Sequence, residues 1–98
     1  MTNTVFSALS HPLRRQVMTL LRKGPKTSGE LAEVFDASWP TVSRHLAVLK
    51  DADLITAERK GTSVIYRANT SVIEDAAAAL LALVGKDNGD DDMKEAAE

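Results

Sequence analysis

The chain has 98 residues, a length typical of one small domain. Its 12 Lys and Arg against 14 Asp and Glu give a net charge of −2, which taken whole argues against a nucleic-acid binder with a basic footprint. Hydrophobic residues make up 44% of the chain, enough for a packed core and too much for a wholly disordered chain. The absence of cysteine excludes disulfides, thiolate metal sites and thiol redox sensing.

The acidic residues are concentrated at the C-terminus. Residues 86–98 (KDNGDDDMKEAAE) hold six acids and two lysines, a net charge of −4. The other 85 residues therefore carry ten bases and eight acids, a net charge of +2. Because the tail has no apolar period, we expect one folded domain over residues 1–85 and a disordered acidic tail over 86–98.

No targeting or membrane segment is predicted. Residues 1–9 lack the basic flank and apolar run of a signal peptide. The longest apolar run, residues 76–84, has nine residues, whereas a membrane-spanning helix needs roughly 20. We therefore expect a cytoplasmic protein without a membrane partner.

Two helices are predicted before residue 25. Residues 4–9 form a short helical piece whose apolar side is Val5, Phe6 and Leu9. A second helix is expected to start with Ser10 as N-cap and Pro12 in its first turn, where the missing N–H has no helical partner to lose. Its buried stripe follows the helical period at Leu13, Val17, Leu20 and Leu21. Gly24-Pro25 ends it.

Two further helices follow, separated by a few residues. Thr27 and Glu30 fit a capping box at the start of the third helix, before the apolar residues Leu31, Val34 and Phe35. Ser38 can cap the fourth helix, with Pro40 in its first turn. The fourth helix has its apolar stripe at Val42, Leu46 and Leu49, and we expect it to end near residues 51–54.

The chain then changes to strand-like residues. Residues 55–60 and 64–67 are short runs on either side of 61–63, which predicts a hairpin. Thr70 or Ser71 is expected to cap a last helix. The order of four helices, a hairpin and a helix predicts a mainly α fold with a small β-hairpin (α+β). Because the third and fourth helices have helix-turn-helix spacing, the hairpin is interpreted as the wing of a winged helix-turn-helix.

The outer face of the fourth helix, residues 38–51, is a candidate DNA-recognition surface. Its candidate residues are Ser38, Trp39, Pro40, Thr41, Ser43 and Arg44, with His45 at the margin. Arginine can bond guanine with two hydrogen bonds, hydroxyls adapt to base edges or phosphates, and apolar groups contact thymine methyls. The alternative is an ordinary solvated helix face. The lone tryptophan, Trp39, fits either exposure toward a groove or a core or interface anchor.

The predicted wing, residues 58–67, carries cations and hydroxyls near its tip. The candidate DNA-binding residues there are Arg59, Lys60, Thr62 and Ser63. Such groups on a projecting loop suit phosphate or minor-groove contacts. The alternative is a merely solvated turn.

Metal binding and catalysis are not predicted. The two histidines, His11 and His45, lie 34 positions apart without a cluster of further ligands nearby. Zinc sites need three or four convergent ligands. No nucleophile triad, glycine-rich phosphate loop or paired carboxylates appear, so we expect neither an enzyme nor a metal or other cofactor.

Several segments together resemble the ArsR family of bacterial winged-helix repressors. The segments are FSALSHPLRRQVMTLL and SGELAEVFDASWPTVSRHLAVLKDADLITAERKGTSVIYRAN, and the resemblance spans residues 6–84. It implies a homodimer built by the first and last helices, which places two recognition helices in successive major grooves of a palindromic double-stranded DNA operator. By position, it implies base or phosphate contacts by Trp39, Pro40, Ser43 and Arg44, with Arg59, Lys60 and residues 61–63 in the wing.

The chain departs from the metal-sensing members of that family. It has no cysteine, and its last helix, SVIEDAAAALLALV, has Glu74 and Asp75 but no histidine. It therefore looks more like the metal-independent branch, some of whose members repress their own operon. Trp39 stands where a polar residue is common, so the family does not indicate its base preference.

Apolar residues of the first and last helices are the candidate dimer interface. They are Val5, Phe6, Leu9, Val72, Ile73, Ala76, Leu80 and Leu83. A stripe this apolar would be costly to expose, and a symmetric interface would cover it. The alternative is burial in the core of a single chain.

The leading hypothesis is a dimeric DNA-binding repressor. A winged-helix protein-interaction module without DNA binding, and a regulator that responds to a small ligand, remain as alternatives. No residue pattern indicates the operator sequence or a ligand.

Overall fold

The computed structural model describes residues 2–85, so the predicted acidic tail at 86–98 lies outside the described residues. The elements in chain order are α1 (Thr2–Ala8), α2 (Pro12–Arg22), β1 (Lys26–Thr27), α3 (Ser28–Val34), α4 (Trp39–Asp51), β2 (Ile55–Lys60), β3 (Ser63–Ala68) and α5 (Thr70–Leu83). This order confirms the predicted class, mainly α with a hairpin after the fourth helix.

The sheet has one strand more than the sequence predicts. β3 pairs antiparallel with β2 on one side and with the two-residue β1 on the other, in the order β1-β3-β2. Lys26 faces Tyr66 and Thr27 faces Ile65 in the β1–β3 register. β1 therefore anchors the start of α3 to the middle of β3.

Two helix starts differ from those expected. His11, not Ser10, caps α2: its Nδ1 accepts from the backbone N–H of Leu13 at 3.1 Å. The Ser10 hydroxyl donates instead to the carbonyl of Ser7, which it reaches at 2.6 Å. At α5 the N-cap is Asn69 rather than Thr70 or Ser71, without a side-chain capping bond. Its side-chain amide donates to the carbonyl of Asp53, because the turn after α4 lies beside it.

The other two predicted caps are confirmed. Thr27 accepts from the backbone N–H of Glu30, and the Glu30 carboxylate accepts from the backbone N–H of Thr27 at 2.8 Å. The bond from the backbone N–H of Thr27 favours the charged carboxylate, so the pKa of Glu30 is lowered. Ser38 caps α4 by accepting from the backbone N–H of Thr41.

The carboxyl end of α4 is a Schellman motif with aspartate in the left-handed position. Asp53 has φ 61°. Its backbone N–H donates to Lys50, and that of Leu54 donates to Leu49, which are the two bonds of this motif. Leu49 and Leu54 are both fully buried, as the accompanying apolar contact requires. The motif thus turns the chain from α4 directly into β2.

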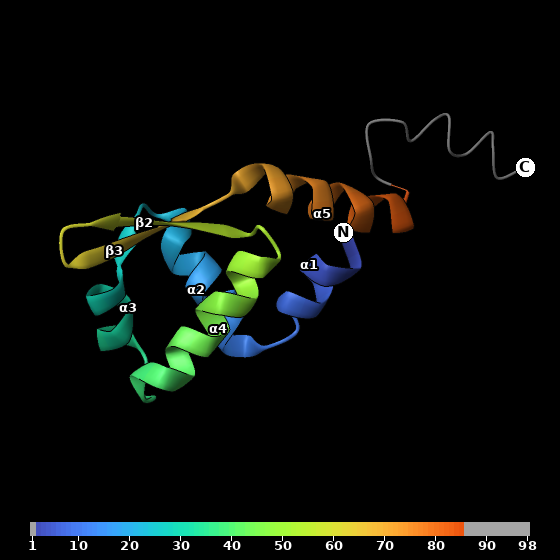
Figure 1. Ribbon diagram of the computed structural model, residues 1–98. Coiled ribbons are helices and arrows are strands. Elements are labelled where there is room, and N and C mark those ends of the chain that lie inside the picture. The colour runs from blue at the N-terminus through green and yellow to red at the C-terminus, as the bar shows by residue number, and fades with distance from the viewer. Residues whose placement is uncertain (1, 86–98) are drawn as a thin grey trace, which may run out of the picture.

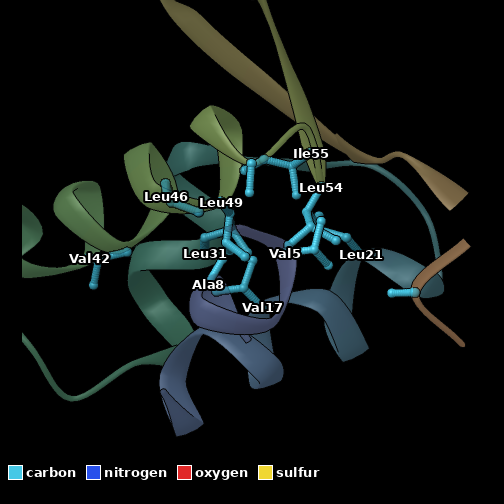
Figure 2. Close-up of a cluster of buried hydrophobic side chains, with 12 residues drawn as sticks. Val5, Ala8, Val17, Leu21, Leu31, Val42, Leu46, Leu49, Leu54 and Ile55 are labelled. Atoms are coloured by element: carbon cyan, nitrogen blue, oxygen red, sulfur yellow. The ribbon is translucent and has the colours of Figure 1, made fainter. Parts of the chain in front are cut away.

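The core lies between the helices and the base of the hairpin (Figure 2). Its fully buried larger side chains are Leu31, Leu49, Leu54, Ile55, Val17 and Val42. Burying such a side chain contributes about 1.5–3 kcal/mol. No polar or charged side chain is buried within the described part of the chain. Residues from α2, α3, α4 and β2 thus hold the helix-turn-helix together.

The molecule has two distinct ends (Figure 1). α1 and α5 lie together at one end, where they contact each other. The turn between β2 and β3 projects at the other end, on the same side as the amino end of α4. The hairpin tip and the amino end of α4 therefore lie away from α5, although α4 also contacts α1.

Candidate nucleic-acid interface

α4 presents a continuous exposed stripe opposite its buried one. Val42, Leu46 and Leu49 are buried, with exposures of 0–2%. The helical period places the opposite stripe at i, i+4, i+7 and i+11, where the exposed residues are Pro40, Arg44, Ala47 and Asp51. Ala47 is not among the residues predicted from the sequence, although the same helical spacing points to it.

The amino end of α4 is rich in hydroxyl and aromatic groups. The Ser38 hydroxyl lies 3.0 Å from that of Thr41. Trp39 occupies the first helical position and is 40% exposed, so it is not a core anchor of this chain. Thr41 and Ser43 are half-buried, on the flanks of the outward stripe. This end can therefore offer hydroxyls, an indole and backbone N–H groups to a ligand.

Arg44 is the cation of the outward stripe. It is exposed, and the single ion pair found within residues 2–85 joins Arg67 and Glu58, not Arg44. Its guanidinium carries five N–H donors in a planar fork suited to guanine edges and phosphates.

His45 lies at the edge of this surface and faces inward in part. It is half-buried, and its Nδ1 lies 3.0 Å from a terminal nitrogen of Arg14 on α2. Its ring centroid is 4.3 Å from that of His11. Burial, followed by the nearby charges of His11, Arg14 and Arg44, lowers the pKa of His45. One side of its ring is thus engaged within the protein.

The hairpin tip is a two-residue turn, Gly61-Thr62, between the paired residues Lys60 and Ser63. Gly61 has φ 63°, whereas Thr62 is not in the left-handed region, as in a type II′ turn. Arg59, Lys60 and Thr62 are exposed and Ser63 is half-buried. Because successive strand residues point to opposite faces, Arg59 and Lys60 place one cation on each face of the hairpin.

Three aspartates line a hollow at the other end of the molecule. Asp51, Asp53 and Asp75 line a hollow of about 190 Å³ between α1, the end of α4 and α5. Within residues 2–85 no group of three or more metal-ligating side chains is placed to hold an ion. Bases thus lie at the hairpin tip and on the outward face of α4, and the acids of this hollow lie beside α1 and α5. Other acids lie elsewhere: Glu30 and Glu33 on α3, Asp36 before α4, and Glu58 on β2.

The candidate interface residues fall into three classes of exposure. Val5 and Ala76 are each 6% exposed in the single chain, so most of both side chains is already covered by the chain itself. Phe6, Leu9, Val72 and Ile73 are half-buried. Leu80 and Leu83 are 52% and 82% exposed. Leu81 and Val84 are also exposed, and both belong to the apolar run that ends α5.

Comparisons with known proteins agree with this architecture. Residues 11–57 match the description "Bacterial regulatory protein, arsR family". The transcriptional repressor SdpR of Bacillus subtilis is 42% identical over 91 residues, which are 93% of this chain and 99% of SdpR. The chain belongs to the ArsR family. As an ArsR-family protein it is a DNA-binding transcriptional regulator and not an enzyme.

Other relatives support the same fold. An arsenical resistance operon repressor of Staphylococcus xylosus is 32% identical over 72 residues, covering 74% of this chain and 69% of that protein. A solved ArsR-like transcriptional regulator from Rhodococcus superposes with a TM-score of 0.76 at 26% identity, covering 98% of this chain and 87% of that one. No helix of residues 2–85 has the length and apolarity needed to cross a membrane.

Proposed function

We propose that this ArsR-family regulator represses transcription as a homodimer that binds a palindromic operator. The observation that carries the proposal is the outward stripe of α4, with Arg44 exposed near the amino end of the helix. In this arrangement α4 enters the major groove, and Pro40, Ser43 and Arg44 reach bases or phosphates. Ser38, Trp39, Thr41 and His45 border that contact.

The hairpin provides the second contact. Arg59, Lys60, Thr62 and Ser63 contact the flanking backbone or minor groove, where cations and hydroxyls bind phosphate. The net charge of +2 over residues 1–85, with Arg59 and Lys60 exposed beside the hairpin tip, supports this assignment.

The dimer is proposed from the exposed apolar end of α5. Leu80 and Leu83 would be costly to leave in water, and α1, which carries the half-buried Phe6 and is followed by the half-buried Leu9, contacts α5. A two-fold interface pairs identical surfaces, so it also predicts a palindromic site with half-sites about 34 Å apart, one helical turn of DNA.

The proposed regulator acts in the cytoplasm without a resident metal. The 98-residue sequence lacks cysteine, which removes thiolate ligands, and the described residues offer no cluster of other ligands. Addition of zinc should therefore leave its melting temperature and operator affinity unchanged.

DNA binding is tested by selecting bound fragments from a genomic pool and measuring affinity for the enriched sequence. We expect an inverted repeat, with an affinity that falls steeply as salt rises. Absence of salt-dependent binding at micromolar protein would instead favour the protein-interaction module.

The dimer is tested by sedimentation of the full chain. Leu83→Glu should shift the protein toward the monomer and weaken operator binding. Gln16→Glu adds the same charge at an exposed position of α2 and should change neither. A Leu83→Glu protein that remains fully dimeric would contradict the interface.

A further inference from the structure

Arg14 on α2 contacts two other helices at once. Its Nε donates to the carbonyl of Ala8, and one terminal nitrogen lies 3.4 Å from the carbonyl of Ser7, both in the last turn of α1. Its other terminal nitrogen reaches Nδ1 of His45 on α4 at 3.0 Å. The side chain is half-buried, and its bonds to Ala8 and His45 are partly shielded from water, whereas the contact with Ser7 is exposed.

The chemistry of the two side chains determines which group donates in the hydrogen bond between Arg14 and His45. Arginine is always charged and only donates, so Nδ1 of His45 is the acceptor and its neutral ring carries the proton on Nε2. The last carbonyls of a helix have no partner within the helix and carry partial negative charge. A guanidinium can bond two of them and still donate elsewhere, whereas a lysine ammonium lacks the planar fork that does this.

We propose that Arg14 is a positioning residue for DNA recognition, which fixes the orientation of α4 relative to α1 by joining the carboxyl end of α1 to His45. His45 directly follows Arg44, so the Arg14 bridge, which joins the carbonyls of Ser7 and Ala8 to His45, acts at the part of α4 that is proposed to contact DNA. The inference rests on the proposed function, because α1 belongs to the proposed dimer interface. In the dimer, the Arg14 bridge sets the angle between the two recognition helices and therefore how well both helices fit their half-sites.

Arg15 provides a matched control within the same helix. Its guanidinium donates to the carbonyl of Leu9 at 2.8 Å, so it also holds the segment that follows α1, but no hydrogen bond joins it to α4 in the described part of the chain. Arg14→Met and Arg15→Met remove the same charge and keep a similar apolar stem. The difference between them isolates the link to His45.

The experiment measures affinity of the full chain for operator and for scrambled duplex over a range of salt. Arg14→Met should reduce the ratio of operator to scrambled affinity about tenfold, as expected for losing a charged hydrogen bond. Its salt slope should stay at the wild-type value, because no phosphate contact is lost. Arg15→Met should leave the ratio within about twofold. A reduced slope for Arg14→Met, or equal losses in both variants, would overturn the proposal.

Two further measurements keep the inference separate from the proposed function. NMR titration without DNA should show that Arg14→Met raises the pKa of His45, whereas Arg15→Met does not; an unchanged pKa refutes the contact.

In a double-mutant cycle with His45→Phe, the double variant should discriminate operator from scrambled duplex no worse than Arg14→Met alone, and additive losses refute the coupling. Arg14→Lys, which keeps the charge, is the substitute if the methionine variant does not fold, and it should show the same loss of discrimination. Wild-type affinity for the selected operator, measured in parallel, tests the proposed function itself.

Discussion

Replacing Arg44 by alanine removes the cation from the outward stripe of α4. The side chain is exposed and makes no ion pair within residues 2–85, so the free energy of unfolding should stay within about 0.5 kcal/mol of wild type. A two-bond contact between arginine and a base is worth about 1–3 kcal/mol of discrimination. The dissociation constant for the operator should therefore rise roughly 5- to 150-fold.

The assay is fluorescence anisotropy with the selected operator and a scrambled duplex of equal length, at one stated salt concentration. Lys50→Ala is the control, because it removes one positive charge from the last turn of the same helix. Lys50 lies six residues beyond Arg44, about 9 Å further along the helix axis. Urea unfolding of both variants checks that neither loss comes from stability.

Two results would refute this reasoning. Operator affinity equal to wild type in Arg44→Ala would remove Arg44 from the recognition surface. Equal losses on operator and scrambled duplex would make Arg44 a phosphate contact rather than a base contact, since phosphate contacts carry no sequence information.

Four other outcomes are expected. Lys60→Ala should weaken binding to all sequences similarly and reduce the magnitude of the log–log salt slope by about 0.9, as measured by titration between low and moderate salt; an unchanged slope would exclude a phosphate contact by this residue. Leu31→Ala should lower the free energy of unfolding by about 2–5 kcal/mol in urea, because Leu31 is 0% exposed; a loss under about 1 kcal/mol would mean that the cavity collapses. Asp53→Val should cost about 1–2 kcal/mol because a β-branched residue resists the left-handed region, whereas Asp53→Gly should not destabilise; equal stability of the two variants would contradict the strain argument. Because the pKa of His45 is lowered in the folded chain, the unfolded chain binds more protons than the folded chain once the pH falls below about 6.5. The contribution of His45 to the free energy of unfolding is therefore complete above that pH and is lost as the pH falls through the folded-state pKa. The free energy of unfolding in urea should thus change less between pH 7.5 and pH 5.5 for His45→Phe than for wild type. An equal change in both proteins would contradict the lowered pKa of His45.

Local signals in the sequence located most of the elements. The capping box of Thr27 and Glu30 and the cap at Ser38 were predicted correctly because both are bonds between residues three positions apart. The buried stripe of α4 followed from helical period alone. The same period places Arg44 on the exposed face, so the cation of the recognition surface follows from the spacing of residues along the chain.

Signals that depend on distant neighbours were missed. β1 is two residues long and exists through its pairing with β3, which no local pattern shows. Ser10 was expected to cap α2, but its hydroxyl bonds back to α1 and His11 takes the role. Val5 and Ala76 were expected at a dimer interface, and their 6% exposure within the single chain could not be predicted, because apolar periodicity does not tell which surface a residue meets.

The whole-chain charge of −2 argued against a DNA-binding protein. Counting the acidic residues 86–98 separately leaves a charge of +2 on residues 1–85, so the sequence alone already removes that objection. The sequence by itself determined the helix-turn-helix and hairpin, the caps of α3 and α4, and the absence of thiol chemistry, because period, capping and composition act over a few residues. Only the tertiary structure decided the exposure of Trp39 and the contact of Arg14 with His45, 31 positions away. Such contacts form only after the helices pack together, so their partners cannot be identified from spacing along the chain.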